Sequence, residues 1–138
     1  MKRKIFVDSD VILDVLADRE PHSGPAKKLF NMMDKGEVDG FTSPLIFSNL
    51  FYLLRKQNGQ SAAKGQLKKL RILFKVLPMD EKVVDSALES ALSDFEDASQ
   101  YHCASKAGIE TIITRNGKDY KGIAGNLLTP DEFLLSLN

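Results

Sequence analysis

Apolar residues are distributed along this chain in two alternating patterns. Short apolar or β-branched runs predict strands at 5–7, 41–43, 76–79, 111–114 and 127–129. Between these runs, apolar positions three and four residues apart predict helices at 11–16, 23–35, 44–57, 61–75 and 81–92, then one that ends at Gly108 and one that begins at Pro130. Strands that alternate with helices indicate an α/β sandwich with a mostly parallel sheet and right-handed crossovers.

The helix expected at 61–75 has an apolar face and a basic face. Leu67, Leu70 and Phe74 fall on the apolar side. The basic side carries residues at spacings of four, three and four, namely Lys64, Lys68, Arg71 and Lys75. Such a stripe suits the phosphate backbone of a nucleic acid. Solvated faces of amphipathic surface helices commonly look the same, so both interpretations stand.

The size and composition are those of an ordinary globular chain. Its 138 residues suit one domain, 1–138, with 43% hydrophobic and 28% charged residues. The formal net charge is zero, so nucleic-acid binding would depend on a local patch. The lone Cys103 excludes an intramolecular disulfide and a multi-cysteine zinc site. Because we find no signal peptide and no apolar run long enough to cross a bilayer, we expect a cytoplasmic protein without membrane contact.

Carboxylates directly follow the first predicted strand, at Asp8 and Asp10. In open α/β sheets, ligands bind just outside the carboxyl ends of the strands. Asp8 is therefore a candidate centre for a metal or phosphate site. The alternative is that Asp8 or Asp10 caps the following helix, because aspartate is a favoured N-cap residue. Both interpretations fit this first motif.

Further acids lie at the ends of later elements. Asp94 and Asp97 are three residues apart and would project from one face of a helix, and Asp119 follows the strand at 111–114. Clustered carboxylates repel one another unless a cation binds between them, and oxygen ligands favour Mg²⁺ or Mn²⁺ over zinc. Such an ion activates water for attack on a phosphodiester. The alternative is a solvated loop and helix start in which aspartate has its ordinary capping role.

Three short motifs occur in order along the chain. They are Asp8-Ser9-Asp10-Val11-Ile12-Leu13-Asp14, Asp94-Phe95-Glu96-Asp97-Ala98 and Thr114-Arg115-Asn116-Gly117-Lys118-Asp119-Tyr120. In their order and spacing they resemble the PIN-domain ribonucleases, the group that includes VapC-like toxins of bacterial toxin–antitoxin pairs. The resemblance covers essentially the whole chain. It implies a PIN-like three-layer sandwich with an acidic pocket at the strand ends, where Mg²⁺ or Mn²⁺ supports endonucleolytic hydrolysis of RNA, and it also implies a homodimer and an antitoxin partner.

The same resemblance implies roles for individual residues. Asp8 and Asp97 match the metal-binding aspartates, and Asp94 is an additional acid beside them. The expected catalytic set is Asp8, Asp94, Asp97 and Asn116, of which the three aspartates would bind the metal. Residues expected to support the site are Ser9, Asp10, Asn49, Thr114 and Asp119. Residues expected to guide RNA are Lys64, Lys68, Arg71, Arg115 and Lys118.

One position departs from the family pattern. Many PIN nucleases carry a glutamate in the second conserved helix, where this chain has Asn49 within Phe47-Ser48-Asn49-Leu50. Asparagine offers a carbonyl oxygen but no charge, so metal binding would be weaker and a candidate general base is missing. The last acidic position of the family pattern is likewise Asn116. A catalytically weakened PIN-like module that binds RNA or a protein is therefore the alternative function.

A second alternative comes from the first motif alone. Asp8-Ser9-Asp10-Val11 after a hydrophobic strand also resembles the haloacid-dehalogenase-type phosphatases. In those enzymes the first aspartate accepts a phosphoryl group and the second acts as a general acid or base. That family also has a late pair of aspartates that typically follows a glycine, and Asp94-Phe95-Glu96-Asp97 has no such glycine.

Overall fold

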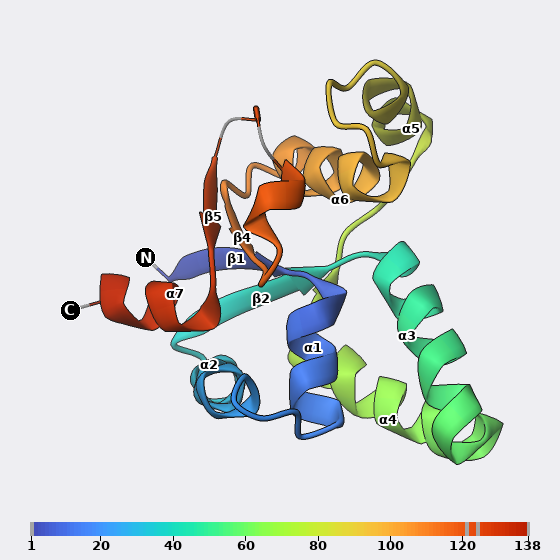
Figure 1. Ribbon diagram of the computed structural model, residues 1–138, viewed down its shortest axis with the longest axis vertical. Coiled ribbons are helices and arrows are strands. Elements are labelled where there is room, and N and C mark those ends of the chain that lie inside the picture. The colour runs from blue at the N-terminus through green and yellow to red at the C-terminus, as the bar shows by residue number, and fades with distance from the viewer. Residues whose placement is uncertain (1, 121, 124, 138) are drawn as a thin grey trace.

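Five parallel strands form the centre of the computed structural model, which describes residues 2–120, 122–123 and 125–137 (Figure 1). Their order across the sheet is β3-β2-β1-β4-β5, and each neighbouring pair is parallel. The strands are β1 (Arg3–Val7), β2 (Val38–Thr42), β3 (Lys75–Val76), β4 (Thr111–Ile113) and β5 (Asn126–Leu128). The α/β architecture with a mostly parallel sheet, predicted from the alternating pattern, is confirmed.

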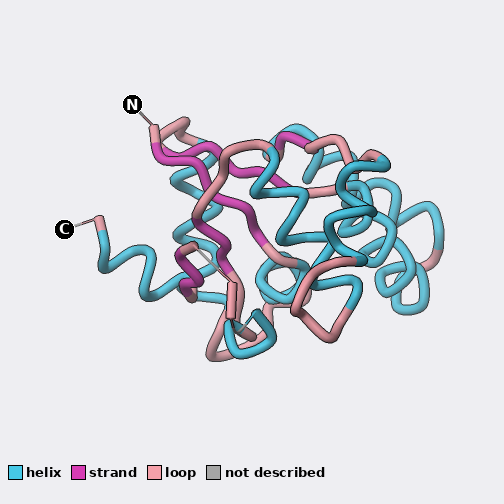
Figure 2. Tube along the Cα trace, turned by 90° about the horizontal axis from the view of Figure 1, so that it is seen from above, coloured by secondary structure: helices cyan, strands magenta, loops and turns pink. Residues whose placement is uncertain are grey.

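Helices cover both faces of this sheet. They are α1 (Ser9–Leu16), α2 (Ser23–Asp34), α3 (Pro44–Asn58), α4 (Gln60–Leu73), α5 (Glu81–Leu88), α6 (Phe95–Lys106) and α7 (Pro130–Ser136), with a short 3₁₀ helix, η1 (Gly117–Tyr120). In Figure 1, α5 and α6 lie above the sheet, and α1, α2 and α4 lie below it. Figure 2 shows the strands gathered on the side where both termini lie, with helices extending to the other side.

The start of α3 illustrates how local sequence sets a helix boundary. Ser43 has an extended backbone, and its Oγ accepts a hydrogen bond of 3.2 Å from the backbone N–H of Ile46. Pro44 follows at the first helical position, where its missing N–H costs nothing. This cap explains why the predicted helix at 44–57 agrees with α3 to within one residue. The same helix carries Asn49.

The helix predicted at 61–75 is shorter than expected. Helix α4 ends at Leu73 because Phe74 adopts an extended backbone, with φ −106° and ψ 143°, and buries its ring. Lys75 then begins β3 instead of continuing the basic helix face. The proposed basic stripe therefore reduces to the exposed residues Lys64, Lys68 and Arg71.

Two strands also differ from their predicted extents. Strand β2 begins at Val38, although Asp39 and Gly40 are poor strand formers. A Cβ at Gly40 would lie 2.2 Å from Cε of Met33, so a larger residue there would force the buried Met33 side chain to move. Strand β3 has two residues instead of the four predicted at 76–79, since Pro78 has no N–H to donate. The backbone of Leu77 still donates to the Thr42 carbonyl at 2.9 Å.

The strand order places a change of direction beside β1. The chain passes from β1 to β2 on one side, and later returns to β4 on the other side of β1. In open α/β sheets, ligands bind outside the carboxyl ends of strands at such a switch point. The residues that follow β1 and β4 are Asp8 and Thr114. The fold therefore brings the first and third sequence motifs together at the carboxyl ends of the neighbouring strands β1 and β4, the edge of the sheet at which the candidate site lies.

Candidate active site

Asp8 lies at the junction of β1 and α1. Its backbone N–H donates to the carbonyl of Ile113 at 2.9 Å, which ties it to the end of β4. Oδ1 of Asp8 accepts from the N–H of Ser9 at 2.8 Å, as the N-cap of α1. Oδ2 accepts from the hydroxyls of Thr114 at 3.2 Å and Tyr120 at 3.1 Å. One carboxylate thus has both roles considered from the sequence: one oxygen caps a helix, and the other faces the strand ends.

Asp10 is the second acid of the first motif and lies in the first turn of α1. Its Oδ2 accepts from the N–H of Arg115 and from Nδ2 of Asn116, both at 3.0 Å. Its Oδ1 is buried without a hydrogen-bond partner. Burial, reinforced by the charge of Asp8, raises the pKa of Asp10 to about 6. Asp10 therefore carries an uncompensated acceptor at the site, in the supporting place expected for it.

Thr114 and Asn116 join the two acids to the loop after β4. The Thr114 hydroxyl lies 3.2 Å from Oδ2 of Asp8 and 3.4 Å from Oδ2 of Asp10. Because the hydroxyl has one proton, it serves one of these carboxylates at a time. The backbone N–H of Asn116 donates back to the Thr114 hydroxyl oxygen at 3.1 Å. Thr114 and Asn116 therefore contribute hydrogen-bond donors to the site, and the carboxylate of the third motif comes from Asp119 in the cleft.

Arg115 occupies a different place from the one predicted for it. Its guanidinium bonds the carboxylate of Asp14 through Nε at 2.6 Å and through Nη2 at 3.2 Å, instead of facing solvent to guide RNA. Asp14 itself has no solvent exposure. The sequence analysis did not assign Asp14 a role. A signal was present, because Asp14 shares a helix face with Asp10 and lies among the apolar residues of α1.

The second motif places Asp94 and Asp97 in unlike positions. Asp94 lies outside the helix, as the N-cap of α6, and its Oδ1 accepts from the N–H of Asp97 at 2.9 Å. Both carboxylates would project from one helix face only if the whole stretch were helical, and this condition is not met because Asp94 has an extended backbone. The capping alternative holds for Asp94, while Asp97 lies in the first turn of α6.

Asp97 has the most crowded electrostatic environment of the acids at this edge. Burial and then the charges of Asp94, Asp8, Asp119 and Glu96 raise its pKa to about 7. The first and second motifs are connected through η1, because Tyr120 donates to Asp8 and its neighbour Asp119 lines the cleft together with Asp97. At neutral pH, the Asp97 carboxyl accordingly holds a proton for part of the time unless a cation replaces it.

Glu96 is a further acid that the sequence analysis quoted within a motif but gave no role. Its Oε1 accepts from Nδ2 of Asn49 at 2.7 Å, which links α6 to α3. Burial and then the charges of Asp94 and Asp8 raise its pKa. The amide of Asn49 is therefore placed beside a carboxylate, and the two side chains lie near the same acidic cluster.

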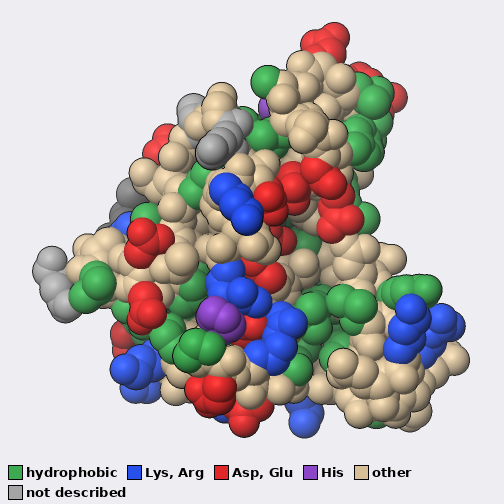
Figure 3. Space-filling model, viewed as in Figure 1, with side chains coloured by type: hydrophobic (Ala, Val, Ile, Leu, Met, Phe, Trp, Pro, Cys, Tyr) green, Lys and Arg blue, Asp and Glu red, His purple; other side chains and the backbone are tan. Residues whose placement is uncertain are grey.

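A cleft of about 360 Å³ opens beside these acids. Its lining includes Asp94, Asp97, Asp119 and one basic residue, Lys118. Figure 3 shows acidic side chains gathered near the middle of this face, with basic side chains next to them. Lys118 thus lies where the sequence placed an RNA-guiding group. Lys64, Lys68 and Arg71 do not line this cleft, and Arg71 donates to the carbonyl of Phe74.

The donor set at this edge fits a hydrated hard cation. In the described parts of the chain, no three acidic, histidine or cysteine side chains converge closely enough to enclose a metal ion by themselves. Mg²⁺ usually keeps several waters and binds through one or two carboxylates. The buried, unpaired Oδ1 of Asp10 and the raised pKa of Asp97 show negative charge that a cation would neutralise. The residues present therefore fit Mg²⁺ or Mn²⁺ with water, not a closed zinc cage.

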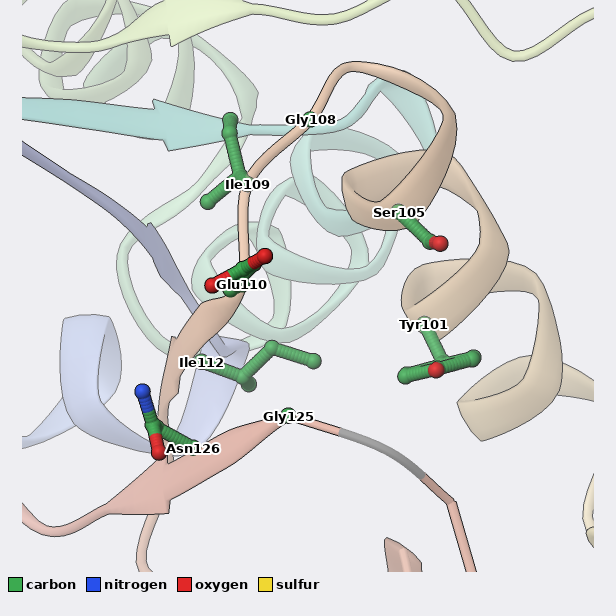
Figure 4. Close-up of a pocket in the computed structure, with 8 residues that line it drawn as sticks. All are labelled: Tyr101, Ser105, Gly108, Ile109, Glu110, Ile112, Gly125 and Asn126. Atoms are coloured by element: carbon green, nitrogen blue, oxygen red, sulfur yellow. The ribbon is translucent and has the colours of Figure 1, made fainter.

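A separate cavity of about 400 Å³ lies at the opposite end of the strands, where β4 and β5 begin (Figure 4). Tyr101 and Ser105 on α6 line it on one side, and Glu110, which immediately precedes β4, lines it on the other. Asn126, the first residue of β5, completes this side. Glu110 is the one acidic residue in its lining, so the carboxylates converge at the other end of the strands.

None of the helices in residues 2–120, 122–123 and 125–137 has the length and hydropathy needed to span a membrane.

Comparisons with known proteins identify the family of this chain. The family model of the PIN domain matches residues 4–118. Ribonuclease VapC1 of Aquifex aeolicus is 26% identical over 135 residues, which cover 94% of this chain and 92% of that protein. Among solved structures, Mycobacterium tuberculosis VapC20, described as a Sarcin-Ricin loop cleaving toxin, has a TM-score of 0.68 at 19% identity and covers 87% of this chain and 95% of its own. A toxin–antitoxin complex from Klebsiella pneumoniae has a TM-score of 0.69 at 19% identity, over 91% of this chain and 97% of its own.

Proposed function

This chain belongs to the PIN-domain family, and we propose that it is a divalent-metal-dependent endoribonuclease, the toxin of a type II toxin–antitoxin pair. The observation that carries the proposal is an acidic site at the switch point of the sheet. Asp8 accepts from the Tyr120 hydroxyl of η1, and the same short helix lines the cleft of Asp94 and Asp97 through Lys118 and Asp119. A ribonuclease from Aquifex aeolicus aligns with nearly the whole chain, which supports the same activity here. Hydrolysis of cellular RNA, together with the free and buried Cys103, fits action in the cytoplasm.

Asp8 and Asp97 are the residues that would hold the ion, with Asp94 and Asn116 completing its surroundings or positioning water. When bound, a divalent cation supplies Lewis acidity at a phosphodiester oxygen and lowers the pKa of a water molecule. The hydroxyls of Thr114 and Tyr120 fix the orientation of the Asp8 carboxylate. To hold the ion, Asp97 would have to be ionised, because a ligand carboxylate must be deprotonated.

Lys118, the basic side chain in the lining of the cleft, gives the RNA substrate a place to bind. Lys118 lies beside Asp94 and Asp97, where its ammonium can neutralise a phosphate next to the scissile one. The net charge of the chain is zero, so attraction of RNA depends on such local groups. We therefore assign RNA guidance first to Lys118, and place the α4 residues Lys64, Lys68 and Arg71 at the outer end of a longer RNA. Arg115 is not included, because its guanidinium bonds the carboxylate of Asp14.

Exposed apolar side chains provide surfaces for the proposed homodimer and antitoxin. Tyr52 and Leu53 are exposed on α3, and Val84 and Leu88 are exposed on α5. Phe95, at the start of α6, lies next in sequence to the cap residue Asp94. An antitoxin that covered Phe95 would approach the mouth of the acidic cleft. Such a contact would connect partner binding with inhibition.

Cleavage of RNA with variants of the two metal-binding aspartates tests the proposal. We expect Asp8→Asn and Asp97→Asn each to lower the Mn²⁺-dependent cleavage rate by about 100-fold or more. EDTA should abolish wild-type cleavage. The matched control is Asp85→Asn, which removes a carboxylate from the exposed face of α5 and should leave the rate unchanged.

Unchanged cleavage in both variants would overturn the assignment. A wild-type protein that binds RNA without cleaving it would instead support the weakened PIN-like module, for which Asn49 and Asn116 are the specific observation. The phosphatase alternative has no support from the family match, which spans residues 4–118.

A further inference from the structure

The contact between Asn49 and Glu96 lies where helices α3 and α6 meet. Oε1 of Glu96 accepts from Nδ2 of Asn49 at 2.7 Å, a short bond of the kind made with an ionised acceptor. The sequence analysis treated Asn49 as a lost charge, since an amide cannot replace a carboxylate. The structure places a carboxylate directly against that amide, supplied by the neighbouring helix.

A second bond between the same helices fixes their relative position. The hydroxyl of Ser43 donates to Oε1 of Gln100 at 2.6 Å, and both residues are buried. Gln100 lies one turn after Glu96 on α6, and Ser43 caps the helix that carries Asn49. This buried bond lies one helical turn from the exposed contact between Asn49 and Glu96 and joins α6 to the cap of α3, so the core limits how far the two side chains can separate.

Glu96 lies at the start of α6 between Asp94 and Asp97, the two acids of this helix start that line the cleft, and its side chain bonds Asn49. The charges of Asp94 and Asp8 both act on it, after burial, in raising its pKa. Asp97, one residue later, is in turn affected by the charge of Glu96. Glu96 therefore belongs to the same group of interacting carboxylates as the two proposed metal-binding residues. Its bond to Asn49 occupies one oxygen and leaves the other available to water or a cation.

We propose that Glu96, anchored by Asn49, is an acid of the metal pocket and supplies the carboxylate that position 49 lacks. This inference rests on the proposed function. Asn49 is then a positioning residue: it holds the Glu96 carboxylate towards the ion and its waters instead of binding the ion by charge. A carboxylate in this position adds negative charge to the pocket and accepts hydrogen bonds from the waters that Mg²⁺ or Mn²⁺ retains.

Calorimetric titration of Mn²⁺ and Mg²⁺ into the intact protein tests this role without depending on cleavage. Loss of an outer ligand typically weakens metal affinity by about 10-fold to 100-fold, and we expect Glu96→Gln to do so. The matched control is Glu81→Gln on α5, which also removes one negative charge from the first turn of a helix. The control should bind with wild-type affinity. Thermal melting in EDTA verifies that both variants are folded.

An exchange of the two side-chain types tests the anchoring contact itself. The double variant Asn49→Glu/Glu96→Gln keeps one carboxylate and one amide across the α3–α6 contact, with their places reversed. We expect it to recover at least about half of the lost binding free energy, since coupled residues in contact are strongly non-additive. A double variant that binds Mn²⁺ no better than Glu96→Gln would overturn the proposed replacement of the missing carboxylate.

The outcome for Glu96 is separable from that for the proposed function. If Glu96→Gln binds Mn²⁺ as the wild type does while Asp97→Asn does not bind, Glu96 has no part in the pocket and the metal site stands. If the wild-type protein binds neither Mn²⁺ nor Mg²⁺, the proposed function and the role of Glu96 are both overturned.

Discussion

Nε of Arg115 lies 2.6 Å from Oδ2 of Asp14, a carboxylate that has no solvent exposure. Nε of Arg19 lies 2.9 Å from the other oxygen, so two guanidinium groups neutralise one buried acid. Arg115 lies between Thr114 and Asn116, both of which bond Asp10. The ion pair therefore fixes the loop after β4 against α1 and holds the site's hydrogen-bond donors in place.

We expect Arg115→Ala to destabilise the protein markedly. Breaking a buried ion pair costs about 3–5 kcal/mol, and the remaining bond to Arg19 should reduce the loss to about 2–3 kcal/mol. Urea denaturation in EDTA measures this free energy of unfolding. The control is Arg55→Ala, where the guanidinium lies over the exposed ring of Tyr52 and the expected change is within about 0.5 kcal/mol. Equal stability of the two variants would show that the Asp14 pair contributes nothing.

The sequence predicted the fold well because its main signals are local. Caps such as Ser43 and the spacing of apolar residues set the helices, and the run at 5–7 marks the central strand. The predicted length of strand β2 was too short because Gly40 is a poor strand former, and its place in the strand depends on packing against Met33, which belongs to another element. Element boundaries that depend on packing between elements have no signal in a local window.

The candidate site was predictable in part for the same reason. Its aspartates follow strands or begin helices, so their positions could be inferred from the order of elements. The pairing of Asp14 with Arg115 spans 101 residues, and that of Asn49 with Glu96 spans 47. Neither separation leaves a pattern in one sequence. The function of Arg115 was misread because its partner was unknown, and Glu96 was passed over because Asn49 was considered alone.

The raised pKa of Asp97 predicts that the metal-free protein becomes less stable as the pH rises. This pKa is about 7 in the folded protein, because of burial and then the charges of Asp94 and Asp8, against an ordinary value of 3.8. Between these two values the folded state holds a proton that the unfolded state has released. Stability is therefore lost as the pH rises from about 4 to about 7. Asp10, with a pKa of about 6, acts in the same direction.

Thermal melting in EDTA across this pH range measures the effect. Asp97→Asn should melt with a shallower pH dependence than the wild type, and should be the more stable of the two at the alkaline end. Added Mg²⁺ should stabilise the wild type most at that end, where the carboxylate is ionised and binding to the folded state is strongest. Identical pH profiles for wild type and variant would mean that Asp97 titrates normally in the folded protein.

Lys118 and the basic face of α4 make different predictions for RNA binding. Lys118 lines the acidic cleft, and Lys64 and Lys68 do not. We expect Lys118→Ala to raise the KM for a short RNA by about 10-fold with a smaller change in kcat, because a phosphate contact made before the chemical step is lost. Lys64→Ala/Lys68→Ala serves as the comparison and should leave this KM unchanged. Steady-state cleavage of the same RNA decides between them, and a larger effect of the double variant would move the RNA path to α4.

The bond between Ser43 and Gln100 predicts how strongly the site depends on the core. Ser43 donates to Oε1 of Gln100 at 2.6 Å and also accepts from the N–H of Ile46 as the cap of α3. Ser43→Ala removes both interactions and leaves Oε1 of Gln100 buried without its partner. Loss of the cap costs about 1 kcal/mol, and an unsatisfied buried acceptor costs about 1–3 kcal/mol more.

Thr129→Ala provides the matched comparison, because Thr129 caps α7 through an exposed capping box and bonds no buried side chain. It should cost about 1 kcal/mol, from the cap alone. Urea denaturation should therefore separate the two variants by about 1–3 kcal/mol. Ser43→Ala should also weaken Mn²⁺ binding, since α3 and α6 carry Asn49 and Asp97, whereas Thr129→Ala should not. If both variants lose the same stability and bind Mn²⁺ equally, the α3–α6 bond does not position the site.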